Sequence, residues 1–406
     1  MKVLIVNAYS GHGSTGRIVE SIADIIESHG DQAYIAYGYY KSKHKNTIKL
    51  KAGGRYHALY EIMKCRITGY FGYTSSASTY RLIHWIKKNK PDIINLHNIH
   101  GGYVHISLLA KYLQKAGIPI VWTLHDCWTF TGHCTHFQLV KCDRWKTECF
   151  DCPNRALKKN YPISYFFDRS KEQYRWKKAD FSAIPNVTMV TPSCWLEGQV
   201  KQSFFKQSKF LTIHNGIDLD VFRPTDSICK ARLGCEGKKM VLAVAAGWGN
   251  RKGLDYVYEL SKRLPRDEYQ VVIVGLKDKQ MDSVPEGVIG IKRTNSTKEL
   301  AQLYSAADVM VNPTLEDTYP TVNLEAIACG TPVVTFRTGG SPESITAETG
   351  AVVDQHDMDS LVRETITWAH RNVKDICRQY ALDNFSAANC FDAYYDLFVK
   401  LFQNSD

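Results

Sequence analysis

Apolar, β-branched segments alternate with helical patterns along the whole chain. In the first half, a helical pattern covers 16–29, and strand character appears at 2–6, 32–37, 92–96, 118–124 and 187–190. The pattern restarts with apolar segments at 210–213, 240–245, 270–274, 288–291, 309–312 and 332–336. Such alternation is typical of a parallel sheet with crossover helices. The sequence therefore predicts an α/β protein with two doubly wound units.

The boundary between the predicted units lies near Asn215-Gly216, where a turn dipeptide interrupts the apolar periodicity, and Arg223-Pro224 marks the entry to the second unit. We expect an N-terminal domain, a second domain and a C-terminal helix over 1–208, 209–385 and 386–406. Open parallel sheets bind ligands at the carboxyl ends of their strands. Two such units facing each other predict a central cleft that carries the function.

Composition narrows the class of protein. Of the 406 residues, 44% are hydrophobic and 23% are charged, which argues against disorder, collagen and coiled coil. The apolar runs 241–246 and 271–274 are far shorter than the roughly 20 residues that cross a bilayer. The apolar stretch 3–6 is too short for a secretory signal core. We therefore expect a cytoplasmic protein, whose 12 cysteines are thiols or metal ligands rather than disulfides.

The net charge of +10 is concentrated in one stretch. Between Lys41 and Lys90, twelve lysines and arginines accompany a single acid, Glu61. Such a stretch attracts nucleic acid, an anionic membrane surface or a phosphorylated substrate, unless it is simply a solvated basic surface. Within it, cations alternate with aromatic residues at Lys64, Arg66, Tyr70, Phe71 and Tyr73.

A glycine-rich turn, Gly11-His12-Gly13-Ser14-Thr15-Gly16, follows the first predicted strand and opens a helix. It matches a dinucleotide fingerprint only in part, because Asn7 to Ser10 intervene and Asp31 comes at the start of the second strand. The free amides of a helix N-terminus favour an anion. We interpret the segment either as a loop that approaches phosphate or acceptor, or as a tight turn.

Two strand ends carry candidate polar chemistry. His125 ends the strand 118–124 and is expected to hydrogen-bond a sugar hydroxyl or a developing charge, with Asp126 fixing its tautomer or the following loop. A structural histidine is the alternative. Arg251-Lys252-Gly253 follows the strand 240–245 and opens a helix, which suits a diphosphate.

The segment from Asp317 to Glu325 lies between a strand and a short helix of about 321–329, which Gly330 and Pro332 close. We expect Asp317 in the loop and Glu325 near the first turn of the helix, both facing one crevice. Carboxylates with helix amides between them suit a ligand that carries several hydroxyls and one anion. A sugar nucleotide has these groups.

A cysteine-rich insertion covers about 127–155 and has His133 and His136 beside its first cysteine. Its four clustered cysteines either bind a structural zinc ion or are ordinary free thiols. They are Cys134, Cys142, Cys149 and Cys152.

The segment 317–325, followed by Ala-Ile-Ala-Cys-Gly-Thr-Pro-Val-Val, resembles the acidic motif of the retaining glycosyltransferases of family 4. Further matches are His-Asn-Gly-Ile-Asp with Phe222 and Pro224, Arg-Lys-Gly, Thr-Gly-Gly-Ser-Pro-Glu and the His125-Asp126 pair, at 214–224, 251–253, 338–343 and 125–126. Trp-Thr-Leu-His-Asp-Cys-Trp with the cysteine cluster resembles colanic-acid-type enzymes of bacterial surface polysaccharide synthesis. The resemblance implies a GT-B fold, with two Rossmann-like domains around a cleft and a last helix at about 387–402 that crosses back to the N-terminal domain.

The resemblance also implies roles for individual residues. The N-terminal domain binds the acceptor and the second domain binds a UDP- or GDP-sugar. The catalytic residues are His125, Asp317 and Glu325. The donor-binding residues are Gly16, Arg251, Lys252, Ile291, Glu316, Thr318, Tyr319 and Glu325. Two positions depart from the family pattern: Asp317 replaces the usual Glu, with Glu316 adjacent, and Gly247 replaces an Arg.

The expected activity is retaining transfer of a hexosyl group from a nucleotide sugar to a glycan or a polyprenyl diphosphate-linked acceptor. No catalytic metal and no nucleic-acid partner are expected, and the basic stretch predicts peripheral contact with an anionic membrane at the inner face of the cell membrane. Two alternatives remain open at this stage, namely a GT-B nucleotide-sugar epimerase and a zinc-containing nucleic-acid-binding protein.

Overall fold

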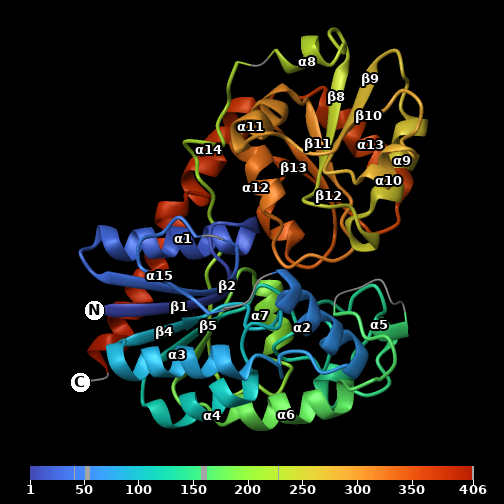
Figure 1. Cartoon of the computed structure of the whole chain (residues 1–406). Helices are drawn as coiled ribbons and strands as arrows, with labels where there is room; N and C mark the ends of the chain where they lie inside the picture. The colour runs from blue at the N-terminus through green and yellow to red at the C-terminus, as the bar shows by residue number, and fades with distance from the viewer. Residues whose placement is uncertain (41, 51–54, 157–161, 227, 405–406) are drawn as a thin grey trace. The chain divides into compact units, whose positions relative to one another are not determined.

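The computed structural model describes residues 1–40, 42–50, 55–156, 162–226 and 228–404, which form two compact units. The first unit comprises Met1–His214 and Phe391–Asp406, and the second comprises Asn215–Cys390 (Figure 1). The chain thus passes from the first unit to the second and returns at its C-terminal end.

In the described part of the first unit, seven parallel strands form one sheet in the order β3-β2-β1-β4-β5-β6-β7. The strands are β1 (Lys2–Tyr9), β2 (Gln32–Tyr39), β3 (Thr47–Lys49), β4 (Ile93–Leu96), β5 (Ile120–Thr123), β6 (Val187–Thr191) and β7 (Lys209–Thr212). The central strands are unbroken apolar runs, because a parallel sheet is covered by helices on both faces. The sheet order reverses direction between β1 and β4, so the segments that follow these two strands flank a switch point.

The helices of the first unit include α15, which contacts the turn between α1 and β2 through Tyr395. His29, just after α1, stacks on Tyr395 with ring centroids 3.9 Å apart, and the Tyr395 hydroxyl donates to Asp31 Oδ2 at 2.9 Å. The helices are α1 (Gly13–Ser28), α2 (Arg55–Thr68), α3 (Ser76–Asn89), α4 (Ile106–Ala116), α5 (Pro153–Ala156), α6 (Ser170–Ser182), α7 (Cys194–Val200) and α15 (Ala387–Gln403).

The second unit has a parallel sheet in the order β10-β9-β8-β11-β12-β13. Its strands are β8 (Lys239–Val244), β9 (Tyr269–Val274), β10 (Ile289–Ile291), β11 (Val309–Asn312), β12 (Val333–Phe336) and β13 (Gly350–Val353). The switch point of this sheet lies between β8 and β11, which are direct neighbours. The helices are α8 (Cys229–Arg232), α9 (Leu254–Arg263), α10 (Asp278–Met281), α11 (Thr297–Ala306), α12 (Thr321–Ala328), α13 (Met358–Ala369) and α14 (Lys374–Asn384).

Each unit has its own hydrophobic core. In the first, Trp122 of β5 is fully buried and meets Phe181 of α6 edge-on, with ring centroids 4.9 Å apart. In the second, Leu242 of β8 and Leu324 of α12 are fully buried. Burying one such side chain contributes about 1.5–3 kcal/mol, so these contacts hold the strand ends that carry the polar residues.

The structure corrects one assignment of a strand to a domain. The segment 210–213, predicted to begin the second unit, forms most of β7, which pairs with β6 in the first sheet. β7 is an edge strand with alternating exposure, so it lacks the apolar run that would have tied it to a particular sheet. The short strands β3 and β13 were not predicted. β1 extends to Tyr9, three residues beyond its predicted end.

Candidate functional site

At the carboxyl ends of β4 and β5, beside the switch point of the first sheet, two histidines lie against each other. His97 directly follows β4, and His125 follows β5 by one residue. His97 Nδ1 is 2.9 Å from His125 Nε2, and the two rings stack with centroids 5.1 Å apart. His97 Nε2 is 2.7 Å from Asn95 Oδ1. Asn95, His97 and His125 therefore form a hydrogen-bonded chain, here called the histidine chain.

Burial keeps the two imidazoles of the histidine chain uncharged. His97 is 1% exposed, and its desolvation, with the neighbouring His125, holds its pKa well below the ordinary 6.5. Desolvation also lowers the pKa of His125 to about 4, with His100 acting in the same direction and Asp126 opposing it. Both imidazoles are consequently neutral near pH 7.

Asp126 organises the loop that follows β5. Its carboxylate accepts the Trp128 amide at 2.9 Å and lies 2.9 Å from His100 Nε2. Burial would raise the pKa of Asp126, but His100 and the Trp128 amide outweigh it and lower that pKa to about 2. Asp126 was predicted either to fix the tautomer of His125 or to fix the following loop, and these contacts are with the loop and with His100. His125 Nε2 is bonded by His97. Asn95 and His97 were not predicted as site residues, although both lie near the end of a strand that neighbours the one before His125.

The glycine-rich turn is tight and already holds a carboxylate. The Gly11 amide donates to the Gly16 carbonyl at 3.0 Å, and Gly11 adopts φ +66°. A Cβ added to Gly11 would lie 2.7 Å from Glu20 Oε1, which accepts the Ser10 hydroxyl at 2.9 Å. Asp31 bonds the N-terminal ammonium at 2.6 Å. Only Ser10 separates β1 from the turn, and Gly16 lies in the first turn of α1, where its donor-binding role stays a prediction.

In the second unit, the predicted cation and carboxylate segments meet at the switch point. Arg251 and Lys252 lie in a short 3-10 helix (Asn250–Lys252) after β8, and Asp317 lies after β11. Lys252 Nζ is 2.5 Å from Asp317 Oδ2, across 65 residues of sequence. The Arg251 carbonyl accepts the Leu315 amide at 2.7 Å. The two loops are thus joined through backbone and side chain.

Two glycines permit this close approach. Gly253 has φ +73°, and a Cβ there would lie 2.0 Å from the Pro313 carbonyl oxygen. Gly339 has φ +54°, and its Cβ would lie 1.7 Å from the Asp317 carbonyl oxygen. Such distances exclude any other residue without movement of the backbone. The segments after β8, β11 and β12 therefore pack backbone to backbone around Asp317.

The helix predicted over 321–329 is α12, and Glu325 is its fifth residue, near the first turn as predicted. Glu325 is buried, with 3% of it exposed, and Glu325 Oε2 accepts the Tyr304 hydroxyl at 3.0 Å. Thr318 and Tyr319 are also buried. Asn323 anchors the helix, since its amide donates to the hydroxyls of Ser341 and Ser344 and accepts from Asn312.

The two adjacent acids before α12 differ in accessibility. Glu316 is 1% exposed, whereas the side chain of Asp317 is 14% exposed and pairs with Lys252. Asp317 is the more accessible carboxylate at this strand end.

Ile291 ends β10, and its carbonyl accepts the amides of Gly275 and Leu276 at 2.9 and 3.3 Å. The backbone of the segment after β9 is thereby held against the edge strand of the second sheet.

The predicted cysteine-rich insertion packs into the core of the first unit. A hydrogen bond from the Cys134 thiol raises the pKa of Cys134 and lowers that of Cys152. Burial raises the pKa of Cys149 to about 12, and Cys149 Sγ accepts the Gly132 amide at 3.2 Å. Among the residues that the structure describes, no three His, Cys, Asp or Glu side chains form a group that could hold a metal ion. Structural zinc at Cys134, Cys142, Cys149 and Cys152 stays a prediction.

Aromatic residues are exposed in the first unit, but they are not the ones predicted. Phe71 is buried, and Tyr73 packs edge-on against Trp176. Instead, apolar side chains project from α2 and from the segment before α6, which are joined by a hydrogen bond from the Tyr165 amide to the Arg66 carbonyl at 2.8 Å. We call this set the apolar patch: Tyr60, Ile62, Met63, Ile67, Tyr165, Phe166 and Phe167.

Cations border the apolar patch. Lys64 is exposed on α2, Arg66 Nη1 bonds the Tyr165 hydroxyl, and Arg169 lies over the Phe167 ring at 5.0 Å. Lys41 and Lys51 of the predicted basic stretch lie outside the described residues. In the described ranges, no helix combines the length and the apolar character needed to span a bilayer.

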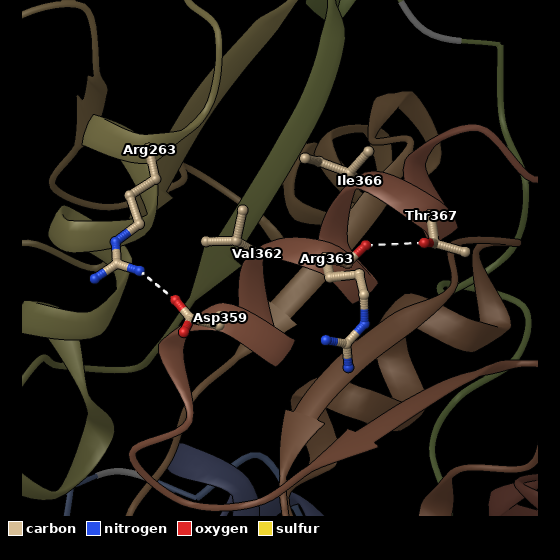
Figure 2. A pocket seen from close by; sticks show the side chains of 6 residues that line it. All are labelled: Arg263, Asp359, Val362, Arg363, Ile366 and Thr367. Atoms are coloured by element: carbon tan, nitrogen blue, oxygen red, sulfur yellow. Dashed lines mark hydrogen bonds and ion pairs between the residues drawn. The ribbon is translucent and has the colours of Figure 1, made fainter.

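A surface hollow of about 400 Å³ lies on the second unit (Figure 2). It is lined by Arg263, Asp359, Val362, Arg363, Ile366 and Thr367. Arg263, whose Nη1 bonds Asp359 Oδ1 at 2.8 Å, is the last residue of α9. Lys252 lies at the other end of this helix, before its first residue. The hollow therefore contributes no residue to the candidate site.

Two protein-family models match the chain. A family model described as "Glycosyltransferase Family 4" matches residues 51–221, and one described as "Glycosyl transferases group 1" matches residues 238–370. A D-inositol 3-phosphate glycosyltransferase from Mycobacterium sp. (strain KMS) is 30% identical over 177 residues, which are 40% of this chain and 38% of that protein. The chain therefore matches well under half the length of that relative.

Two further similarities extend over nearly the whole chain. The glycosyl transferase WcaC of Escherichia coli (strain K12), assigned to colanic acid biosynthesis, is 22% identical over 89% of this chain and 90% of its own length. The structure of Alr3699/HepE from Anabaena, in complex with UDP-glucose, superposes with a TM-score of 0.67 at 13% identity, and covers 98% of this chain and 100% of that one. The two parallel α/β units thus have the GT-B fold.

Proposed function

The chain is a glycosyltransferase of the family 4 type with a GT-B fold, and we propose that it transfers a hexosyl group from a nucleotide sugar to a glycan or lipid-linked acceptor with retention of anomeric configuration. The observation that carries this proposal is the Lys252–Asp317 pair at the switch point of the second sheet. Ligands of doubly wound sheets bind at such a point. The pair offers a cation for phosphate and a carboxylate for hydroxyls.

The donor is proposed to be a UDP- or GDP-sugar. Arg251 and Lys252 bind its diphosphate, Asp317 binds sugar hydroxyls, and Glu325 binds ribose hydroxyls. Asp317 is preferred to Glu316 because it is the more accessible of the two and already contacts Lys252. Thr318 and Tyr319 belong to the donor side, and amides near Ile291 bind the base. The UDP-glucose held by Alr3699/HepE supports this class of donor.

The reaction breaks the bond between the anomeric carbon and the phosphate oxygen and forms a bond to an acceptor oxygen on the same face. The leaving phosphate oxygen takes the bonding electron pair and then the acceptor's hydroxyl proton. Positive charge develops on the sugar and negative charge on the diphosphate, so Lys252 and Arg251 stabilise the transition state if they are fixed in advance. The backbone contacts of Arg251 and Gly253 supply that rigidity. His125 contacts the transferred sugar.

The proposed setting is bacterial surface polysaccharide synthesis, supported by the near full-length similarity to WcaC. A polyprenyl diphosphate-linked acceptor resides in a membrane. The apolar patch, with Lys64, Arg66 and Arg169 at its border, suits the surface of an anionic bilayer, where cations meet phosphate and apolar side chains enter the headgroup region.

Vesicle flotation tests the membrane contact. The wild-type chain is expected to float with vesicles that contain phosphatidylglycerol and to remain behind with pure phosphatidylcholine. Phe166→Asp, at a position 67% exposed, is expected to reduce flotation with unchanged thermal stability. Ile376→Asp on α14, at a position 45% exposed, is the matched control and should float like the wild type. Flotation without preference for anionic lipid would overturn the membrane contact.

Thermal-shift screening followed by product analysis tests the activity. UDP- or GDP-sugars are expected to raise the melting temperature, and addition of a glycan acceptor is expected to give an elongated glycan with release of nucleoside diphosphate. An isomerised donor formed without acceptor would instead identify an epimerase. The absence of any nucleotide effect, together with a salt-sensitive interaction with DNA or RNA, would refute the proposed function.

A further inference from the structure

Aromatic rings gather where the first two strands of the first sheet end. Tyr9 of β1 and Tyr39 of β2 are partners in register, so their side chains leave the sheet on the same face. Their ring centroids lie 5.7 Å apart. The Tyr40 ring lies 5.7 Å from that of Tyr9 and stacks on His12 of the glycine-rich turn, with centroids 4.2 Å apart. We call these four rings the aromatic platform: Tyr9, His12, Tyr39 and Tyr40.

Most of the aromatic platform is open to solvent. Tyr40 is 60% exposed, Tyr9 is 36% exposed, and His12 is also exposed. Tyr40 adopts φ +63°, a left-handed conformation that is uncommon for a bulky residue and costs free energy. Residues held in such conformations cluster at sites that bind ligands. Burial does not explain why a strained tyrosine is kept at this position, whereas ligand binding does.

The carboxylate of Glu20 fixes the base of the aromatic platform. Glu20 Oε1 accepts the Ser10 hydroxyl, from the segment after β1, at 2.9 Å and the Ser42 hydroxyl, from the segment after β2, at 3.1 Å. The Tyr39 hydroxyl donates to the carbonyl of Gly101, in the segment after β4, at 2.5 Å. Three segments at the carboxyl end of the sheet thus hold the rings in place before a ligand arrives, which lowers the entropy cost of binding.

We propose that the aromatic platform binds a sugar ring of the acceptor, with the C–H face of a pyranose stacked on Tyr40 and with Tyr9 and His12 alongside. The face of an aromatic ring is negative and attracts the slightly positive C–H groups of a sugar, while the sugar hydroxyls stay in water. The choice of the acceptor rests on the proposed function, in which Lys252 and Asp317 of the second unit hold the donor. The platform lies at the carboxyl end of β1, which flanks the switch point where ligands of such sheets bind.

The first test needs no donor and no transfer. Saturation-transfer NMR is recorded on the full-length chain with the methyl glycosides of glucose, galactose, mannose, fucose and N-acetylglucosamine. At least one glycoside is expected to receive saturation on the C–H groups of one ring face, to keep it when excess UDP or GDP is added, and to lose most of it with Tyr40→Gly. The proposal is overturned if no glycoside binds the wild type, if UDP or GDP displaces the sugar, or if Tyr40→Gly binds like the wild type.

Matched variants separate the ring from the fold. Glycine adopts φ +63° without strain, so Tyr40→Gly is expected to melt within about 3 °C of the wild type although the ring is gone. Tyr40→Phe keeps the ring and should retain glycoside binding. Tyr80→Ala removes a tyrosine of the same 60% exposure from α3 and should bind like the wild type. Equal losses in Tyr80→Ala and Tyr40→Gly would contradict a site at the platform.

Kinetics connect the aromatic platform with the reaction. With an acceptor that the wild-type chain elongates, Tyr40→Gly is expected to raise the KM for the acceptor by about tenfold or more and to leave the KM for the donor within about twofold. A raised donor KM with an unchanged acceptor KM would overturn the assignment to the acceptor. Glycoside binding at the platform by a chain that transfers no sugar would instead refute the proposed function and leave the sugar site standing.

Discussion

Replacing Lys252 by alanine removes the cation that is proposed to stabilise the leaving diphosphate. Two unit charges about 4 Å apart interact by about 4 kcal/mol at an effective dielectric constant of about 20. The leaving diphosphate gains its additional negative charge only in the transition state, so most of this attraction lowers the barrier. Each 1.36 kcal/mol of barrier is a factor of ten in rate. We therefore expect Lys252→Ala to lower kcat by about 100- to 1,000-fold.

The same substitution should disturb folding much less. The Lys252 side chain is 22% exposed and that of Asp317 is 14% exposed, so solvent screens their attraction. Loss of such a pair costs about 1 kcal/mol of unfolding free energy. Release of nucleoside diphosphate in the presence of acceptor reports the rate, and urea denaturation reports the stability.

Two variants make the comparison specific. Lys262→Ala removes a lysine that is 63% exposed, pairs with Glu259 on α9 and should leave kcat within about twofold of wild type. Lys252→Arg keeps the charge and should retain more activity than Lys252→Ala. Wild-type turnover by a correctly folded Lys252→Ala chain would refute the assigned role.

Three further predictions concern the glycine contact, the histidines and the cysteines. Gly339→Ala should destabilise the chain by about 2 kcal/mol or more, because its Cβ would lie 1.7 Å from the Asp317 carbonyl oxygen; calorimetry checks this, and an unchanged melting temperature would refute the contact. Stability should fall as pH is lowered from 6.5 toward 4, by up to about 1.4 kcal/mol per pH unit for each of His97 and His125, because both stay neutral in the fold while the unfolded chain binds protons; urea titrations across this range that show no loss would refute it. Metal analysis of the purified chain tests the structural zinc: one zinc per chain, lost when Cys134 and Cys152 are replaced by serine, would establish it, whereas a metal-free folded chain, which the ungrouped side chains of the described residues favour, would exclude it.

Much of the fold could be predicted from the sequence because buried parallel strands are continuous apolar runs. The strand at 309–312 has the predicted bounds, and α12 ends one residue before the predicted end. Edge strands such as β7 and β13 carry weaker patterns, since only part of their surface is buried. Their membership in a sheet depends on pairing, which periodicity does not encode.

The candidate site was predictable only where a motif and a strand end coincide. Lys252 and Asp317 are both found this way, yet their contact spans 65 residues and depends on glycines that let two loops touch. The histidine chain joins side chains of two strands, so it requires the register of β4 on β5. The burial of Phe71 likewise depends on packing, and composition alone could not separate it from the exposed Phe166.

The proposed function depends on Lys252, at the switch point of the second sheet, binding the diphosphate of a nucleotide sugar. Calorimetric titration of wild type and Lys252→Ala with UDP and GDP, and with uridine and guanosine as phosphate-free controls, measures this contact. The preferred nucleoside diphosphate should bind at least about tenfold more weakly to the variant, which is a loss of about 1.4 kcal/mol, while the nucleoside should bind both alike. Equal affinity of the diphosphate for both chains would contradict it.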